Sequence, residues 1–274
     1  NVALFRSRDS GHHWERILPS PETPSIVDGD EAVYLYSAAG VWPGGAVTAV
    51  AADPDVPGRL WAGVSPHGSW AQKWGASKGI IGTLKILRSS DGGSTWQQDK
   101  GTLRGDRIEK IFVDGISPLE MEKRVLYAAT GEGVFRSRDG GKTWELSSAE
   151  VPAESIHDLA AGFDLASKRT ALYVTVRHRD GAPSAIWRSR DQAESWQLIA
   201  GPRELPEGIP PRPVGTWRYE AIAACASKPD VIYVSTVYTA ADPVGEFYAA
   251  YRSTDGGESW QCTLRGDPRL KSQN

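Results

Sequence analysis

Short apolar stretches and polar turns follow one another along this chain in an order that returns several times. An apolar stretch ends in a polar turn, and a second apolar stretch, a loop of variable length and a third stretch follow it. The first stretches lie at residues 46–59, 108–117, 155–169 and 219–230, and the second ones at 60–64, 125–130, 171–176 and 231–236. Short apolar runs bounded by turn residues predict β-strands. Units of this kind at a similar spacing are typical of propeller blades.

A polar octapeptide follows the third stretch of each unit and comes five times in the chain. It has the form Ser-x-Asp-x-Gly-x-Thr/Ser-Trp, and an Arg precedes every copy. The copies begin at Ser7, Ser89, Ser137, Ser189 and Ser253 and read SRDSGHHW, SSDGGSTW, SRDGGKTW, SRDQAESW and STDGGESW. The preceding residues are Arg6, Arg88, Arg136, Arg188 and Arg252. A motif that recurs in this way predicts an array of similar structural units.

Each residue type of the octapeptide suits a tight turn between the third and fourth strands of a unit. Glycine supplies backbone angles that other residues resist, and a short carboxylate accepts hydrogen bonds from the turn N–H groups. The tryptophan then packs a large ring against the hairpin. We therefore expect structural roles for Asp9, Asp91, Asp139, Asp191 and Asp255 and for Trp14, Trp96, Trp144, Trp196 and Trp260. A Ca²⁺ loop needs alternating acidic ligands that the motif lacks, so no metal site is expected.

The octapeptide resembles the Asp-box, also called the bacterial neuraminidase repeat. This repeat occurs in β-propellers such as sialidases, xyloglucan-cleaving glycosidases, sortilin-type receptors and photosystem II assembly factors. The resemblance implies an all-β fold with propeller blades of four antiparallel strands. Two copies depart from the pattern: the fourth has Gln192 and Ala193 in its turn, and the first has His13 in place of Thr. We expect the fourth turn to be strained or differently shaped.

The order of strands predicts one propeller domain over residues 1–274, with four full blades and a partial one. The expected blades are 1–18 (partial), 46–99, 107–150, 155–200 and 218–264. We expect an incomplete propeller, an arc of a ring of six to eight blades, because the chain opens directly in a strand-turn-strand unit. The first two box aspartates are 82 residues apart, so residues 31–42 could hold further strands.

Composition narrows the classes of partner. The 274 residues include 31 Lys and Arg against 34 Asp and Glu, which disfavours nucleic acid and other polyanions as partners. The chain contains no run of 18 apolar residues, so no membrane span is predicted. Cys225 and Cys262 are expected on the inner and outer strands of one blade, about 14 Å apart, and therefore as free thiols. No cofactor is implied, and an extracytoplasmic location is implied by the resemblance alone.

The long loops are expected on one face of the propeller, opposite the octapeptide turns. They are residues 19–45, 65–82, 200–217 and 238–247. Loops on a rigid scaffold commonly carry binding residues, and exposed aromatic rings stack on sugars or peptides. The candidates for ligand binding on this face are Trp42, His67, Trp70, Trp74 and Trp217. The alternative is that these rings fold back and pack against their own loops.

Charged residues open the innermost strands at the same face, beside the expected central channel. They are Asp106, Arg107 and Glu109, then His157 and Asp158, then Arg218, Tyr219 and Glu220. Such groups around a concave funnel are candidates for a pocket, and the alternative is a set of salt bridges at solvated strand ends. Among these residues we name Arg107, His157 and Arg218 as candidates for ligand binding.

Two functions from different classes fit these features. The first is a non-catalytic Asp-box propeller that binds an oligosaccharide or a polypeptide, or acts as a scaffold. The second is a sialidase-like or xyloglucanase-like glycoside hydrolase that uses two carboxylates. Its candidate catalytic residues are Glu220, Asp158, Glu109 and Tyr219. The chain lacks the Arg-Ile-Pro segment of sialidases and the Asp-Ile-Gly-Gly stretch of xyloglucan-cleaving enzymes, which favours the binding function.

Overall fold

The fold consists of β-strands throughout the part of the chain that the computed structural model describes. These residues are 3–20, 25–28, 31–34, 45–65, 84–105, 107–152, 156–177, 184–203, 215–240 and 245–265. They form antiparallel sheets and one 3-10 turn, η2 (Met121–Lys123), with no α-helix in these ranges. The all-β class with four-stranded blades is therefore confirmed. No helix in the described ranges has the length and apolar character needed to cross a membrane.

The chain divides into two compact units, which are described separately. The first contains residues 1–131 and 135–146, and the second contains residues 132–134 and 147–274. Each unit contains two four-stranded blades, and the strands of each blade follow one another in chain order across the sheet.

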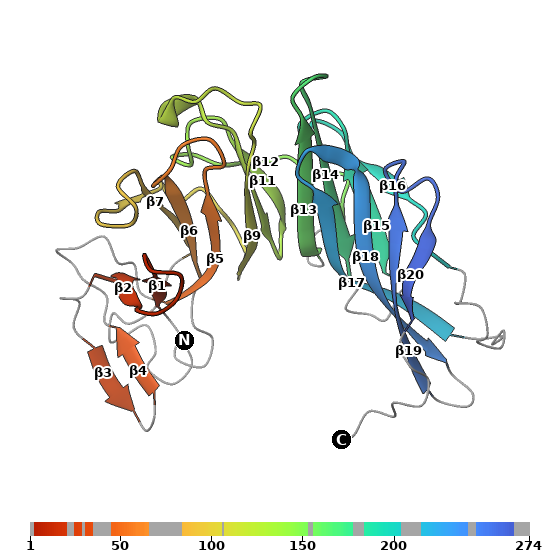
Figure 1. The fold of residues 1–274 in the computed structure, drawn as a ribbon, viewed down its shortest axis with the longest axis horizontal. Helices are drawn as coiled ribbons and strands as arrows, with labels where there is room; N and C mark the ends of the chain where they lie inside the picture. The colour runs from red at the N-terminus through yellow and green to blue at the C-terminus, as the bar shows by residue number, and fades with distance from the viewer. Residues whose placement is uncertain are drawn as a thin grey trace. The chain divides into compact units, whose positions relative to one another are not determined.

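The first unit contains two hairpins and two blades, and Figure 1 shows the strands of each blade side by side. The hairpins are β1 (Leu4–Arg6) with β2 (Glu15–Leu18), and β3 (Ser25–Asp28) with β4 (Glu31–Tyr34). The first blade comprises β5 (Ala46–Ala52), β6 (Leu60–Ser65), β7 (Lys85–Ser89) and β8 (Gln97–Gln98). The second comprises β9 (Ile108–Val113), β10 (Leu126–Thr130), β11 (Gly133–Ser137) and β12 (Glu145–Leu146).

The second unit contains the two remaining blades. One comprises β13 (Ile156–Asp164), β14 (Arg169–Val176), β15 (Ala185–Ser189) and β16 (Gln197–Ile199). The other comprises β17 (Gly215–Cys225), β18 (Lys228–Ala240), β19 (Gly245–Ser253) and β20 (Gln261–Arg265). In each unit, strands begin close to the positions that the apolar runs predict. The second strands of three blades, β6, β10 and β14, are buried on both faces, which agrees with their continuous apolar runs.

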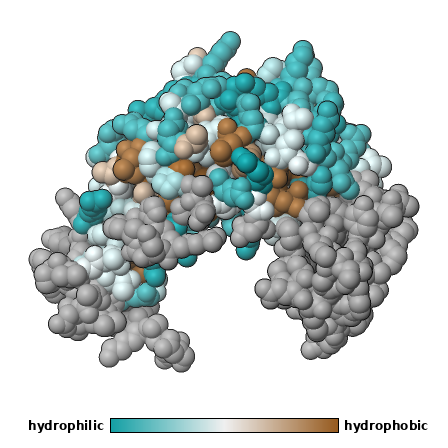
Figure 2. All heavy atoms as spheres, turned by 180° about the vertical axis from the view of Figure 1, so that it is seen from behind, coloured by the Kyte–Doolittle hydropathy of each residue, from teal (hydrophilic) through white to brown (hydrophobic). Residues whose placement is uncertain are grey.

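The cores lie between blade faces that pack on one another. In the first unit Trp61, Ile86, Ile108 and Phe135 belong to one fully buried cluster. In the second unit a cluster around Tyr173 joins both blades, because β13 and β14 pack against β17 and β18. On the face seen in Figure 2, hydrophilic residues cover most of the described surface and hydrophobic residues lie in separate patches.

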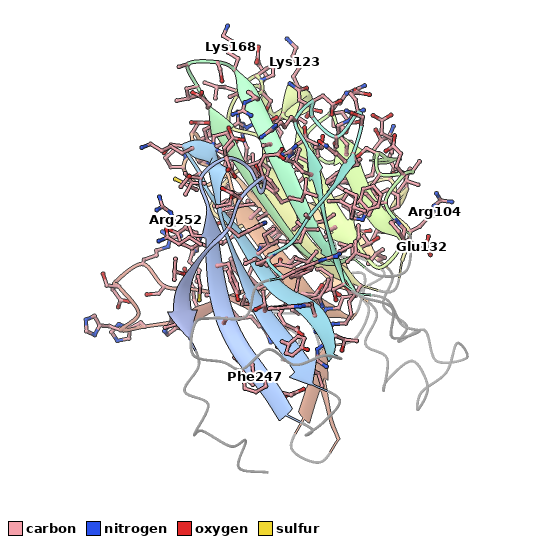
Figure 3. All side chains as sticks on the ribbon, turned by 90° about the vertical axis from the view of Figure 1, so that its right-hand side faces the viewer. Arg104, Lys123, Glu132, Lys168, Phe247 and Arg252 are labelled. Carbon is pink, nitrogen blue, oxygen red and sulfur yellow. The ribbon has the colours of Figure 1, made fainter. Side chains whose placement is uncertain are left out.

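The octapeptide turn of a blade lies at the same end as the turn between the first and second strands. In the first unit the N–H of Gly92 donates to the carbonyl of Gly58, at 2.7 Å, so the octapeptide turn lies beside the β5–β6 turn. In the second unit the N–H of Gly256 donates to the carbonyl of Asp230 at 2.9 Å, beside the β17–β18 turn. Figure 3 shows Lys168, in the β13–β14 turn, and Phe247, near the start of β19, at opposite ends of the second unit.

Parts of the expected loops are strand, which corrects the sequence-based boundaries. The loop predicted at residues 19–45 contains the hairpin of β3 and β4, and the loop predicted at 65–82 begins with Ser65, the last residue of β6. In the loop predicted at residues 200–217, residues from Gly215 onward belong to β17. In the loop predicted at 238–247, residues up to Ala240 belong to β18 and residues from Gly245 belong to β19. In the last blade the reason for the longer β17 and β18 is a cross-strand aromatic pair. Trp217 lies opposite Tyr238 in the ladder, with ring centroids 5.1 Å apart, and such pairs stabilise the extension of two strands.

The two cysteines lie on separate strands of the last blade. Cys225 ends β17 and Cys262 lies in β20, and both are free thiols, as expected.

Candidate functional site

The five box aspartates lie inside their turns, where their carboxylates accept local hydrogen bonds. In every copy one carboxylate oxygen, Oδ1, accepts the hydroxyl of the Ser two residues before it and the backbone N–H four residues after it. The Ser contacts are 2.9 Å for Asp9, 2.8 Å for Asp91, Asp139 and Asp191, and 2.6 Å for Asp255. The N–H donors are His13, Thr95, Thr143, Ser195 and Ser259, at 2.8 to 3.0 Å.

The second carboxylate oxygen binds the side chain that precedes the tryptophan. Thr95 and Thr143 donate their hydroxyls to Oδ2 at 2.6 Å, and Ser195 and Ser259 do so at 2.5 Å. In the first copy the imidazole of His13 takes this place against Asp9. These bonds stabilise the ionised carboxylate, so the Thr95 hydroxyl and N–H lower the pKa of Asp91 to about 2. Carboxylates that are saturated in this way are poor acids or bases near neutral pH.

The fourth octapeptide keeps the shape of the others in spite of its substitutions. Gln192 and Ala193 adopt φ angles of 62° and 64°, the left-handed region that Gly92 and Gly93 occupy in the second copy. The N–H of Ala193 still donates to the Ser189 hydroxyl at 2.9 Å. The turn is therefore strained rather than differently shaped, because L-residues rarely adopt these angles.

The box tryptophans differ in how far they are covered. Trp96, Trp144 and Trp196 are buried and Trp260 is half-buried, whereas the indole of Trp14 is exposed. The indole N–H of Trp196 donates to the carbonyl of Ser147 at 2.7 Å. The rings of Trp96, Trp144 and Trp196 are therefore packed against the protein and have a structural role. In the described ranges no group of three or more His, Cys, Asp or Glu could hold a metal ion.

Charged residues from both blades of the second unit meet around Glu220, midway along β17. The Glu220 carboxylate binds the Arg177 guanidinium, lies 3.3 Å from the His157 imidazole and 3.4 Å from Nε of Arg218. His157 is in β13 and Arg177 follows β14, so neighbouring blades supply the contacts. The sequence predicted His157, Arg218 and Glu220 at this end, and the structure brings these three together.

A second carboxylate extends this group along the sheet. Arg218 also donates to Glu246 at 3.1 Å, and the Tyr248 hydroxyl donates to Glu246 at 2.5 Å. The Tyr248 hydroxyl, followed by Arg218, lowers the pKa of Glu246. The ring of Tyr248 is exposed. We name these residues the Glu220 cluster; its members are His157, Arg177, Arg218, Glu220, Glu246 and Tyr248.

Sequence reasoning missed half of this cluster. Arg177, Glu246 and Tyr248 were absent from the candidates because none of them opens a predicted inner strand. The signal for Tyr248 is its ladder position opposite Val237, which itself pairs with Arg218. Such a register is set only when strands pair, since the side-chain period alone does not fix it.

Other candidate catalytic residues have local structural contacts. Asp158 accepts the N–H groups of Leu159 at 2.8 Å and Ile222 at 3.0 Å. Tyr219 is buried, and burial raises the pKa of its hydroxyl, so it is a poor nucleophile. In the first unit Glu109 pairs with Arg107 at 3.4 Å.

The aromatic candidates fall into two groups. Trp217 is half-buried, and its ring packs against Tyr238 and, 6.4 Å between centroids, Tyr251. This is the packed alternative that the sequence left open. Trp42, His67, Trp70 and Trp74 lie outside the described residues, so their proposed binding roles stay predictions. Asp106, expected at the mouth of the channel, lies outside them as well.

The comparison with family models identifies the repeat. The BNR/Asp-box repeat model matches residues 135–146 and 251–261, which contain the third and fifth octapeptides. The chain carries Asp-box repeats. The other three copies share the same hydrogen bonds from Ser and from the N–H four residues on, so the structure extends the repeat to them. No curated protein matches the chain.

Solved structures give weak similarities. The GH74 xyloglucanase from Xanthomonas campestris is 18% identical, with 85% of this chain and 41% of that one covered and a TM-score of 0.45. An ancestral GH74 enzyme is 16% identical, with 81% and 27% covered and a TM-score of 0.49. The GH93 α-L-arabinofuranosidase of Fusarium graminearum is 13% identical, with 80% and 66% covered and a TM-score of 0.41. The chain spans less than half the length of these GH74 proteins, and similarities this weak give no argument about its activity.

Proposed function

We propose that the chain is a non-catalytic Asp-box propeller module that binds a carbohydrate through the Glu220 cluster. The observation that carries the proposal is a row of solvent-accessible arginines and carboxylates that alternate in charge and lie beside the exposed Tyr248 ring. A sugar presents neighbouring hydroxyls that donate and accept at once. These hydroxyls match the guanidinium donors of Arg177 and Arg218 and the carboxylate acceptors of Glu220 and Glu246.

Exposed ion pairs are suited to this exchange because they contribute little to stability. Arg177, Arg218 and Glu246 each keep about two-fifths of their side-chain surface in solvent, at 43%, 42% and 40%. Pairs of this kind are worth roughly 0–1 kcal/mol, so a hydroxyl can displace one partner at low cost. The apolar face of a pyranose ring would then stack on Tyr248, which supplies the apolar part of the contact.

Glycoside hydrolysis is the alternative function, and the contacts of the two carboxylates in the Glu220 cluster argue against it. A glycosidase needs one carboxylic acid that stays protonated near neutral pH, commonly with a raised pKa. The hydroxyl of Tyr248 and the guanidinium of Arg218 instead lower the pKa of Glu246. The Glu220 carboxylate accepts a hydrogen bond from the Arg177 guanidinium, and Nε of Arg218 lies 3.4 Å from it. Glu246 is therefore a poor candidate for the acid.

Binding of soluble oligosaccharides to the full chain tests the proposal. A glycan array identifies a ligand, and calorimetry then compares wild type with Tyr248→Ala and Arg218→Ala. We expect each variant to lose roughly tenfold or more in affinity, which is about 1.4 kcal/mol. The matched control is Arg190→Ala. Arg190 is equally exposed, at 40%, and pairs with Asp230 at the octapeptide end of the same unit.

Two results would contradict the proposal. If peptides but no glycans bind, or if Tyr248→Ala and Arg218→Ala bind glycans as wild type does, the Glu220 cluster is not a sugar site. Aryl glycosides and polysaccharides test the alternative function, with reducing ends as the readout. Hydrolysis by wild type that Glu220→Gln abolishes would make this chain an enzyme.

A further inference from the structure

An arginine contact joins neighbouring repeats in the same way in both units. The Arg6 guanidinium of the first hairpin binds the carbonyl of Gly92 in the next octapeptide. In the second unit Arg188 donates to the carbonyl of Gly256, at 2.7 Å, in the octapeptide that follows it. The arginine that precedes one octapeptide thus reaches the backbone of the next.

The tryptophan of the incoming octapeptide makes the reverse contact. Trp96 donates its indole N–H to the carbonyl of Ile17 at 3.1 Å, and Trp260 donates to the carbonyl of Ala200 at 2.8 Å. The turn glycine approaches closely as well, since a Cβ on Gly93 would lie 2.6 Å from Cδ1 of Ile17. We call this two-way arrangement the box contact. Its receiving half is a sheet face that carries the Arg and an aliphatic residue, and its inserting half is the octapeptide turn with its Trp.

The last blade carries the receiving half of a box contact on an exposed face. Tyr233 and Arg252 lie opposite each other in the β18–β19 ladder, as Tyr173 and Arg188 do in β14 and β15. Tyr173 is 0% exposed, whereas Tyr233 is 43% exposed. Figure 3 shows Arg252 on the last blade, and its guanidinium carbon lies 6.0 Å from the Tyr233 ring centre.

The same face exposes further apolar residues. Leu264 pairs with Ala250, as Ile199 pairs with Ile186, yet Leu264 is 67% exposed and Ile199 only 6%. Ala223, which pairs with Tyr233, is exposed too. An apolar sheet face with one cation, built like a face that is buried elsewhere in the unit, is an interaction surface. We call it the Arg252 face; its members are Ala223, Tyr233, Arg252 and Leu264.

The first hairpin carries the inserting half of a box contact, also exposed. Trp14 is 64% exposed, against 8% for Trp96. Its indole N–H donates to Gly11 of its own turn at 3.0 Å, the bond that Trp96 also makes with Gly93 at 3.0 Å in addition to its bond to Ile17. A Cβ on Gly11 would meet nothing closer than 3.9 Å, so this turn has open space where Gly93 is tightly packed.

We propose that the Arg252 face of one copy of this chain receives the β1–β2 hairpin of a second copy through a box contact. Arg252 then donates to the carbonyl of Ser10, which occupies the position of Gly92 and Gly256 in the octapeptide. Trp14 packs on Leu264 and donates its indole N–H to the β20 backbone. The contact is heterologous, because different surfaces of the two copies meet. Copies therefore associate head to tail, into closed rings or open chains according to the angle between them.

Sedimentation over a range of concentrations, with the full chain, tests the proposal. We expect wild type to show species larger than a monomer whose share rises with concentration. Leu264→Asp, which places a charge on the receiving face, and Trp14→Ala, which removes the inserting ring, should each weaken self-association roughly tenfold or more. Leu165→Asp is the matched control, because Leu165 is 69% exposed in the β13–β14 turn, away from the Arg252 face.

A mixture of the two variants gives the sharpest result. The Leu264→Asp chain keeps an intact hairpin and the Trp14→Ala chain keeps an intact Arg252 face. Mixed together, they should form a heterodimer that neither forms alone and that stops at two copies. Circular dichroism checks that each variant is folded.

Three outcomes would overturn the proposal. They are a wild type that stays monomeric at every concentration, a Leu165→Asp variant that dissociates as readily as Leu264→Asp, and variants that show no heterodimer when mixed. The two proposals are tested with different variants. Tyr248 lies on the same side of β19 as Arg252, four residues away, but the box contact uses neither Tyr248 nor Arg218. A failed glycan assay therefore leaves this proposal standing, and the reverse also holds.

Discussion

Replacement of Asp139 by alanine tests the structural role of the box carboxylates most directly. The Asp139 carboxylate accepts four hydrogen bonds within its turn. The donors are the Ser137 hydroxyl at 2.8 Å, the Thr143 hydroxyl at 2.6 Å, and the N–H groups of Lys142 at 3.0 Å and Thr143 at 2.9 Å. Alanine removes all of these acceptors while the backbone donors stay fixed by the turn.

The loss in the free energy of unfolding depends on which of these donors can form a hydrogen bond with water instead. The hydroxyls of Ser137 and Thr143 can rotate toward another acceptor, so their loss costs little. The N–H groups of Lys142 and Thr143 belong to half-buried residues and cannot rotate. An unpaired buried donor costs about 1–3 kcal/mol, and partial access of water lowers that figure. We expect a total loss of about 1–3 kcal/mol, which is roughly 2–4 °C in Tm for each kcal/mol.

Urea denaturation followed by tryptophan fluorescence and by circular dichroism measures the change. Asp9→Ala is the control, because the same turn in the first hairpin is exposed and water replaces the lost acceptor; its loss should stay below about 0.5 kcal/mol. Asp139→Asn should fall between the two variants, since an amide oxygen still accepts from one N–H. Unchanged stability of Asp139→Ala, together with lost ligand binding, would refute the structural role.

Three further predictions concern the same turns. Gly93→Ala should cost about 2–3 kcal/mol in urea denaturation, because the new Cβ would lie 2.6 Å from Cδ1 of Ile17 at a φ of 89°. Gly11→Ala has a φ of 93° and open space, so it should cost only about 1 kcal/mol, and equal losses would contradict the packing argument. Asp91 has its pKa lowered from 3.8 to about 2 in the folded chain, so the unfolded chain binds the proton first and stability should fall as pH drops from about 4 to about 2. Denaturation midpoints of Asp91→Asn should change less over that range, and a pH profile identical to that of wild type would contradict the role of Asp91. Trp96→Phe removes the indole donor to Ile17 and should cost about 1–2 kcal/mol by thermal unfolding, whereas an unchanged Tm would show that this bond contributes nothing.

The repeat made much of the fold predictable from sequence. The octapeptides mark the turn between the third and fourth strands of each unit because their residue types serve only local purposes. The hydrogen bonds of Asp91 with Ser89 and Thr95, for example, stay within residues 89 to 95, so its place follows from the local sequence. Long-range packing decided what local pattern could not: β17 and β18 extend beyond the predicted strands because Trp217 pairs with Tyr238 across the sheet.

The candidate site was only partly predictable for the same reason. His157, Arg218 and Glu220 were expected at one end because they open inner strands, and strand order fixes that end. Glu246 and Tyr248 join them through the register of β18 and β19, which no sequence period specifies.

What the sequence alone determined was the local chemistry: five hairpin turns, each closed by its own carboxylate, and the strands that flank them. What only the tertiary structure decided was which faces are covered. Tyr173 and Tyr233 occupy the same place in their repeats, yet one is enclosed by the next blade and the other meets solvent. Residues in a turn interact over a few positions of chain, whereas burial depends on which distant strand packs alongside, and that is a property of the folded molecule.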